Sequence, residues 1–403
     1  MYVTRPLSHY KSFPGDLSLP PEGPNSGYLV IYDDDEPTKT SCFGFCNNPL
    51  FLAELPFPQN KTLTTEYAST GSENQVVSMN EALFIPVLNQ PLSSNRYYVI
   101  KQRGSHKGEA FACSKQEEDI GTHCFGRSVH DVKSRPLCPH DEYQQFEIVN
   151  NGHLFDGDGG FYANSLADDG YPPVFLRTKV WKIHARTPNN FKLSEANGIN
   201  VSLRSRLPDL DFPLSTKVSD SVVVGKWYCP FVFIKEGKLI NQVKNSIFYE
   251  MTLEQKWNQI FIKETEHNEG NVVSVEADIH SEAVFIGKGQ KEAIWDERNV
   301  VDGAIWFTRL ESKKESKKES LGLSLEIIER MKWEEEKVGW VGVGVGEKKF
   351  QKVRREKKYE GTGAWKKFGC YVLVERFVLK RMDGSLVLTY EFSHTHQVKS
   401  IFE

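Results

Sequence analysis

Two apolar runs, “GCYVLVERFVLKRM” at Gly369–Met382 and “SLVLTYEF” at Ser385–Phe392, stand on either side of Asp383-Gly384. Asp-Gly is a preferred sequence for the two-residue type I′ turn that joins antiparallel strands. Counting outward from such a turn gives three cross-strand pairs: Leu379 with Leu388, Phe377 with Tyr390, and Arg376 with Glu391. One face of the predicted hairpin is therefore apolar, and the other carries an opposite-charge pair.

Similar runs of aromatic and branched residues recur along the chain, separated by connectors rich in proline and glycine. Aromatic residues make up 12% of the sequence, and they fit a half-buried sheet surface well. The runs predicted as strands include Tyr28–Tyr32, Ala82–Leu88, Arg96–Gln102, Val174–Ala185 and Ser221–Lys235. We therefore predict an α+β fold, mainly antiparallel β-sheet with few helices.

Two segments have helical signals. Thr252 and Gln255 form a capping box, and Leu253 and Trp257 recur at helical spacing, which predicts a helix near residues 252–265. After Ser324 the sequence “EIIERMKWEEEK” is rich in helix formers and favours a second helix. The leucines just before it also alternate as in a strand, so that alternative stays open there.

The chain of 403 residues is long enough for two domains. A polar, proline-bearing stretch at residues 208–221 suggests the boundary, which gives a β-rich domain at residues 1–215 and a second at residues 216–403. The tract “ESKKESKKES” at residues 311–320 has no apolar residue and is predicted to be a disordered loop in the second domain.

Charge and cysteine usage suggest the compartment. The net charge of −4 is small, and the seven cysteines are too sparse for a disulfide scaffold. The first residues contain prolines and no continuous apolar run, and no stretch is long and apolar enough to span a bilayer. We therefore expect a soluble protein that is cytoplasmic or possibly nuclear.

The glycines of “VGWVGVGVGEKKF” at residues 338–350 suggest a phosphate-binding loop, but Gly342, Gly344 and Gly346 have the wrong spacing for a dinucleotide fingerprint. No cofactor is therefore predicted. The basic segment at residues 348–367 interleaves cations with aromatic rings, as a nucleic-acid patch would. A solvated surface in an acidic protein is the favoured interpretation, so nucleic acid is not expected as a partner.

Cysteine and histidine positions offer one candidate metal site, at Cys124, Cys138 and His140. Their spacing matches no common zinc signature, and free cysteines are the favoured interpretation. Cys124 and a nearby histidine also allow a thiol-imidazole pair. His394 and His396 would share a strand face, but two histidines are an incomplete ligand set, and they are predicted to lie on the surface. No catalytic residue is identified.

Several long phrases resemble a plant-specific family of unknown function, domain of unknown function 1262, whose members are sometimes labelled insecticidal crystal toxin domain proteins. They include “MYVTRPLS” at residues 1–8, “HKGEAF” at residues 106–111, “VVVGKWYCPFVFIKEGKL” at residues 222–239 and “FYEMTLEQKW” at residues 248–257. The resemblance implies a plant origin and a setting in stress or defence. It transfers no catalytic residue.

Taken together, these features predict a non-enzymatic intracellular binding or scaffold protein with a protein or small-molecule partner. The main support is that no complete catalytic constellation is found. A thiol- or zinc-dependent enzyme is the first alternative, and a toxin-like or lectin-like β module is the second. A deep pocket with converging polar groups would favour binding of a ligand over a scaffold role.

Overall fold

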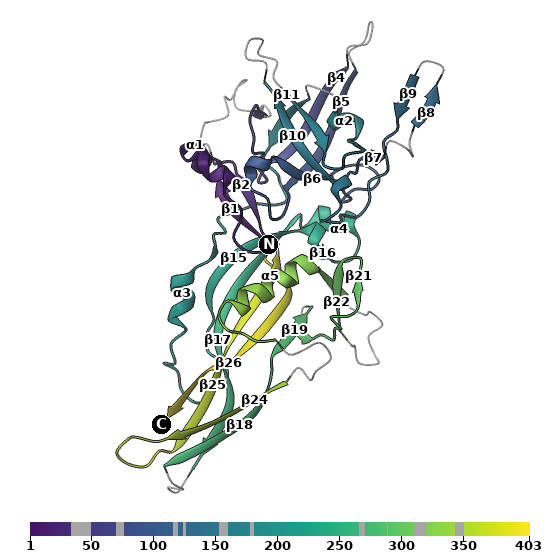
Figure 1. Cartoon of the computed structure of the whole chain (residues 1–403). Coiled ribbons are helices and arrows are strands. Elements are labelled where there is room, and N and C mark those ends of the chain that lie inside the picture. The colour runs from purple at the N-terminus through teal and green to yellow at the C-terminus, as the bar shows by residue number, and fades with distance from the viewer. Residues whose placement is uncertain are drawn as a thin grey trace. The chain divides into compact units, whose positions relative to one another are not determined.

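The protein is described by a computed structural model, shown in Figure 1. The described residues are 1–33, 50–69, 76–115, 120–123, 126–152, 160–177, 181–265, 271–287, 289–309, 320–342 and 350–403. The predicted loop at residues 311–320 lies, apart from Ser320, outside them. Within them the prediction of a β-rich, mainly antiparallel structure is confirmed, because strands predominate and most strand pairs are antiparallel.

The chain forms two compact units. The N-terminal unit comprises Met1–Ala196 and Tyr228–Phe248, and the C-terminal unit comprises Asn197–Trp227 and Tyr249–Glu403. The division at residues 1–215 and 216–403 into two domains stays a prediction. The chain passes between the two units more than once, because Tyr228–Phe248 returns to the N-terminal unit.

The N-terminal unit is built on a seven-stranded antiparallel sheet in the order β11-β10-β6-β5-β4-β13-β3, beside a parallel pair β1-β2. Its core is a cluster of buried rings that includes Phe57, Phe84, Tyr97, Phe161 and Trp181. The elements are β1 (Tyr2–Pro6), α1 (Leu7–Ser12), β2 (Gly27–Ile31), β3 (Leu50–Leu52), β4 (Thr62–Ser69), β5 (Val76–Pro86), β6 (Arg96–Lys101), β7 (Ser114–Lys115), β8 (Ile120–His123), β9 (Gly126–Val129), β10 (Gln145–Asn151), β11 (Gly160–Ser165), β12 (Gly170–Tyr171), α2 (Val174–Arg177), β13 (Lys182–Arg186), β16 (Ile234–Lys235) and α4 (Leu239–Asn245).

One predicted strand of this unit is wrong in its first half. Residues 174–177 form the short helix α2, and the strand β13 begins only at Lys182. Pro173 explains the difference, because its carbonyl accepts the backbone N–H groups of Leu176 and Arg177. A proline at a helix start costs nothing, since the missing N–H would have no partner there.

The C-terminal unit is built on long antiparallel strands in the order β15-β17-β25-β26-β19-β20, with β14 paired to β15. A smaller sheet β23-β22-β21 and a ribbon β18-β24 complete it. The elements are β14 (Gly198–Ile199), α3 (Val201–Arg206), β15 (Val222–Pro230, whose last residues enter the other unit), β17 (Phe248–Glu264), β18 (Val272–His280), β19 (Glu282–Ile286), β20 (Lys291–Glu292), β21 (Val300–Val301), β22 (Ala304–Thr308), β23 (Ser320–Ser324), α5 (Leu325–Glu336), β24 (Phe350–Lys358), β25 (Lys367–Arg381) and β26 (Leu386–Phe402).

The predicted register of the β25–β26 hairpin is confirmed at all three pairs, Leu379 with Leu388, Phe377 with Tyr390 and Arg376 with Glu391. The predicted turn is wrong. Of the two residues Asp383 and Gly384, only Gly384 has a positive φ, +80°, and the N–H of Arg381 donates to the carbonyl of Ser385. The loop therefore has three residues with glycine in the left-handed position.

The register survives because a second irregularity compensates for the longer loop. Lys380 pairs with Leu386, but the preceding residue Leu379 pairs with Leu388. Val387 is therefore the extra residue of a β-bulge, which adds one residue to β26. Together the loop and the bulge return the strands to the pairing that a two-residue turn would give.

The predicted helix at residues 252–265 is wrong, because these residues lie in the 17-residue strand β17. β17 pairs with β25 from Tyr249 opposite Arg381 to Glu264 opposite Lys367. Leu253 and Trp257, which suggested a helix face, are four residues apart and therefore also lie on one face of a strand. Pairing along the whole of β17 outweighs the local helix signal. The hydroxyl of Thr252 makes no hydrogen bond to any residue that the structure describes.

The helix predicted after Ser324 is confirmed as α5, with Ser324 at its N-cap position. The alternating leucines before it form the strand β23, so each signal in this segment describes its own element. α5 packs on the sheet face that holds Phe377 and Tyr390, and this contact is where charged residues gather.

Candidate functional site

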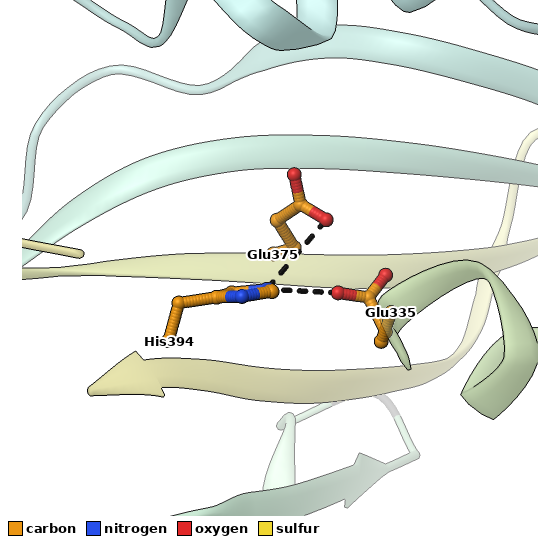
Figure 2. Close-up of side chains that lie close together, drawn as sticks. All are labelled: Glu335, Glu375 and His394. Atoms are coloured by element: carbon orange, nitrogen blue, oxygen red, sulfur yellow. Dashed lines mark hydrogen bonds and ion pairs between the residues drawn. The ribbon is translucent and has the colours of Figure 1, made fainter. Parts of the chain in front are cut away.

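Three buried titratable side chains meet between α5 and the β25–β26 hairpin. Figure 2 shows Glu335, at the end of α5, and Glu375, on β25, both directed toward the imidazole of His394 on β26. The Nε2 atom of His394 lies 2.8 Å from Oε2 of Glu335 and 3.6 Å from Oε2 of Glu375. All three side chains are at most 2% exposed.

The strand register places two of these groups side by side. His394 lies opposite Leu373, and Leu373 is two residues from Glu375 on the same strand. Residues two apart share a face of a strand, so His394 and Glu375 are diagonal neighbours on the face that packs against α5. Gln255 lies opposite Glu375 on β17, and its Nε2 donates to Oε1 of Glu375 at 2.7 Å.

Arg204, on the short helix α3, supplies the principal positive charge. Its Nε donates to both carboxylate oxygens of Glu375, at 3.0 and 3.1 Å, and its Nη2 bonds the same carboxylate and lies 3.3 Å from Glu335 Oε1. Gln255 donates to the backbone carbonyl of Arg204 at 3.0 Å. The bidentate contact between Arg204 and Glu375 fixes α3 against the sheet.

A second arginine and a third glutamate extend the cluster along α5. Arg330 Nη2 donates to Glu334 Oε1 at 2.5 Å, one helical turn away. The other oxygen of Glu334, Oε2, accepts no hydrogen bond from any described residue and lies 3.6 Å from Nη1 of Arg204. The Glu334 side chain is only 2% exposed, so this oxygen is a buried acceptor with spare capacity.

The titration of these groups follows from burial and pairing. Burial alone would raise the pKa of Glu375, but the hydrogen bonds and charge of Arg204 outweigh it and lower that pKa to about 2. Burial, reinforced by the negative charge of Glu375, raises the pKa of Glu335 well above its ordinary value. Burial lowers the pKa of His394 to about 4. At neutral pH Glu375 is therefore ionised and His394 is neutral.

A cavity of about 370 Å³ opens beside the cluster. Its polar wall includes Arg204, Glu334, Glu375 and His394. Its apolar lining consists of Ile199, Val201, Leu207, Val338 and Leu373, and Ser205, Gln255, Lys337 and Gln397 complete the lining. The volume lies at the lower end of the roughly 300–1,000 Å³ typical of small-molecule pockets.

Glu335, Glu375 and His394 are also the group of His, Cys, Asp and Glu side chains in the described part of the chain that could hold a metal ion, with ligand atoms within 4.8 Å of one another. Carboxylate and imidazole suit several divalent metals. Arg204 already occupies both oxygens of Glu375, however, so a metal ion would have to displace the guanidinium. The donor set fits a metal only without that ion pair.

The metal site predicted at Cys124, Cys138 and His140 stays a prediction. Cys124 lies outside the described residues, and Cys138 and His140 are both exposed on the loop before β10. The glycines Gly344 and Gly346 also lie outside the described residues. From Phe350 the basic segment forms β24, where Lys352 and Arg354 pair with Glu276 of β18.

The surface position predicted for His394 is wrong, because this side chain is 1% exposed, whereas His396 is exposed. Two other residues with metal-ligand side chains, Glu335 and Glu375, lie beside His394 in place of His396. One signal in the sequence points to Glu375: it alternates with Phe377 and Leu379, so it falls on the apolar face of the predicted hairpin. A carboxylate on a buried face requires a partner.

The family comparison concerns the N-terminal unit. Residues 22–125 match the model of a family described as “Protein of unknown function (DUF1262)”, which is the family that the sequence phrases resemble. The candidate site lies outside the matched segment.

A solved structure titled “Crystal structure of Cry35Ab1” is similar to the chain at 10% identity and a TM-score of 0.46, with 86% of this chain and 90% of that chain covered. A likeness this loose does not bear on function. No curated protein matches the chain. Among the described residues, no helix combines the length and apolar character needed to cross a membrane.

Proposed function

We propose that this protein is a non-enzymatic binding protein that holds a small molecule in the cavity beside Arg204 and Glu375. The observation that carries the proposal is the combination of an apolar wall with a buried polar wall in one cavity of about 370 Å³. Pockets of this kind gain affinity from apolar burial and orientation from a few fixed polar groups.

Binding is favoured over catalysis because the charged groups hold one another. The Glu375 carboxylate is held by Arg204 and Gln255, so it is a weak base with a low pKa. A general base needs a pKa near the working pH. Among the described lining residues there is no cysteine, so the cavity itself does not support the thiol alternative.

The wider setting is proposed from the family resemblance alone. It comprises a plant origin, a cytoplasmic or nuclear location and a role in stress or defence responses. A small molecule that signals stress or attack would be a suitable ligand for such a binding protein. Ligand binding in the cavity can be tested directly, because a single substitution in its lining can block it.

N-phenyl-1-naphthylamine, a neutral dye that fluoresces in apolar sites, is a suitable probe. We expect its emission to rise on addition of the protein, and the rise to be lost in Ser205→Trp, because Ser205 is an exposed residue of the cavity lining and the indole would fill the space beside it. Ser202→Trp is the matched control, since Ser202 is exposed on the same helix and does not line the cavity. Equal emission with the two variants, or none with the unmodified protein, would contradict the proposal.

A further inference from the structure

The strand β26 has three extra residues beside the cavity. Val372 of β25 pairs with Val398, but the next residue, Leu373, pairs with His394. Residues 395–397 therefore have no counterpart on β25 and form an enlarged bulge. Bulges re-aim side chains and are frequent next to binding sites. This bulge adjoins the cavity, because Leu373 and His394 both line it.

Two uncharged polar side chains, one just before the bulge and one at its end, have unused hydrogen-bonding capacity. The imidazole of His394 bonds Glu335 through Nε2, and its Nδ1 has no hydrogen-bond partner among the described residues. The side-chain amide of Gln397 has no such partner among them either. His394 and Gln397 both line the cavity, so a ligand in it can bond them.

The charged side chains around the cavity give no preference for a charged ligand. Hydrogen bonds join Arg204 to Glu375 and Arg330 to Glu334. Lys337 is exposed, so solvent screens its charge. Three basic side chains stand against three acidic ones, namely Arg204, Arg330 and Lys337 against Glu334, Glu335 and Glu375. A charged ligand would therefore lose hydration without meeting an uncommitted countercharge.

We infer that the cavity binds an uncharged molecule with an apolar body and a hydroxyl group, and that Gln397 and His394 bond this hydroxyl. The inference rests on the proposed function and specifies its ligand class. A hydroxyl both donates and accepts, so it can bond the Gln397 amide and also Nδ1 of His394 in either tautomer of the ring. The apolar body lies along Ile199, Leu207 and Leu373.

Calorimetric titration at pH 7 with four six-carbon probes tests the inference. 1-Hexanol and dipropyl ether are isomers, but only the alcohol donates a hydrogen bond. We expect 1-hexanol to bind about tenfold more tightly than the ether, because the ether leaves a polar group of the cavity without a partner. Hexanoate and the n-hexylammonium ion should each bind at least about tenfold more weakly than 1-hexanol, because their charges lose hydration in the cavity.

Gln397→Leu tests the residue that recognises the hydroxyl. It removes the amide and keeps an apolar side chain, so we expect the preference for 1-hexanol over dipropyl ether to fall from about tenfold to about twofold or less. The ratio of the two affinities does not depend on the fraction of the protein that is folded. His396→Leu is the matched control and should keep the full preference, because His396 is exposed in the same bulge and does not line the cavity.

The possible failures separate the two claims. If dipropyl ether or a charged probe binds as tightly as 1-hexanol, or if Gln397→Leu keeps the full preference, the cavity binds ligands but the hydroxyl inference is wrong. If the neutral dye binds and 1-hexanol does not, the inference is again wrong and the proposed function stands. If neither the four six-carbon probes nor the dye binds, both the inference and the proposed function are overturned.

Discussion

The N-terminal unit buries rings where the C-terminal unit buries charges. In the first, Phe57 packs against Phe161 at 5.0 Å and against Phe84 at 5.3 Å between ring centres. In the second, Arg204 and Glu375 meet on the same sheet face as Phe377. Rings are stabilised by burial itself, whereas buried charges are tolerated only when paired. The charged core is therefore the one whose composition suggests a function beyond folding.

Loss of the main cation should have the largest effect on this contrast. Arg204→Met leaves the Glu375 carboxylate buried without its guanidinium, and we expect it to lower the free energy of unfolding by about 3–5 kcal/mol. Urea unfolding measures the change. Adding Glu375→Leu to the same chain should recover most of the loss, because the pair is then removed together. A single-variant cost no larger than that of a surface change would mean that the ion pair is not held in the folded protein.

The pH dependence of stability should differ between two variants of the charged core. The pKa of His394 falls from 6.5 to about 4 on folding, so its contribution is present above pH 6.5 and is lost as the pH falls toward 4. The pKa of Glu335 rises from 4.5, so its contribution is present below pH 4.5 and is lost as the pH rises through the folded pKa. Between pH 4.5 and 6.5 the two slopes oppose each other.

Glu335→Gln removes one slope and His394→Gln removes the other. Between pH 4.5 and 6.5 we expect the stability of Glu335→Gln to rise with pH and that of His394→Gln to fall, each by at most about 1.4 kcal/mol per pH unit. Thermal unfolding across this range measures both. Parallel pH profiles for the two variants would contradict the opposite directions of the two pKa shifts.

The ring core should respond to volume and not to pH. Phe57→Leu keeps an apolar side chain but leaves a small void among the surrounding rings, and we expect a loss of about 1–2 kcal/mol. The loss should be the same at pH 4.5 and pH 6.5, because none of the rings beside Phe57 titrates in this range. A loss of stability in Phe57→Leu that varies with pH would contradict this distinction between the two cores.

What the sequence predicted depends on how far apart the contacting residues lie. The β25–β26 register follows from alternation across one short loop, and it is correct even though the turn type is not. The helix expected at residues 252–265 fails because β17 is fixed by pairing with residues more than a hundred positions later. Local spacing contains no information about that partner.

The candidate site shows the same limit. Arg204, Glu335 and Glu375 come from three separate segments, and Arg204 and Glu335 look like ordinary surface charges in theirs. Only Glu375 has a sequence pattern that indicates burial, because it alternates with Phe377 and Leu379 on an apolar face. Its partners could not be predicted, since a carboxylate on a buried face specifies that a cation is needed but not which one. Cys138 and His140 had suggestive residue types without such an environment.

The extra residue at Val387 has an evolutionary consequence. A relative that lacks one residue between Leu379 and Leu388 keeps the same strand pairs by losing the bulge and retaining the three-residue loop. Chain length in this hairpin can thus drift by one position while Glu375 and His394 stay on one face. Gaps in related sequences at this point would be silent for ligand recognition, and they should accumulate there more readily than anywhere within residues 373–379.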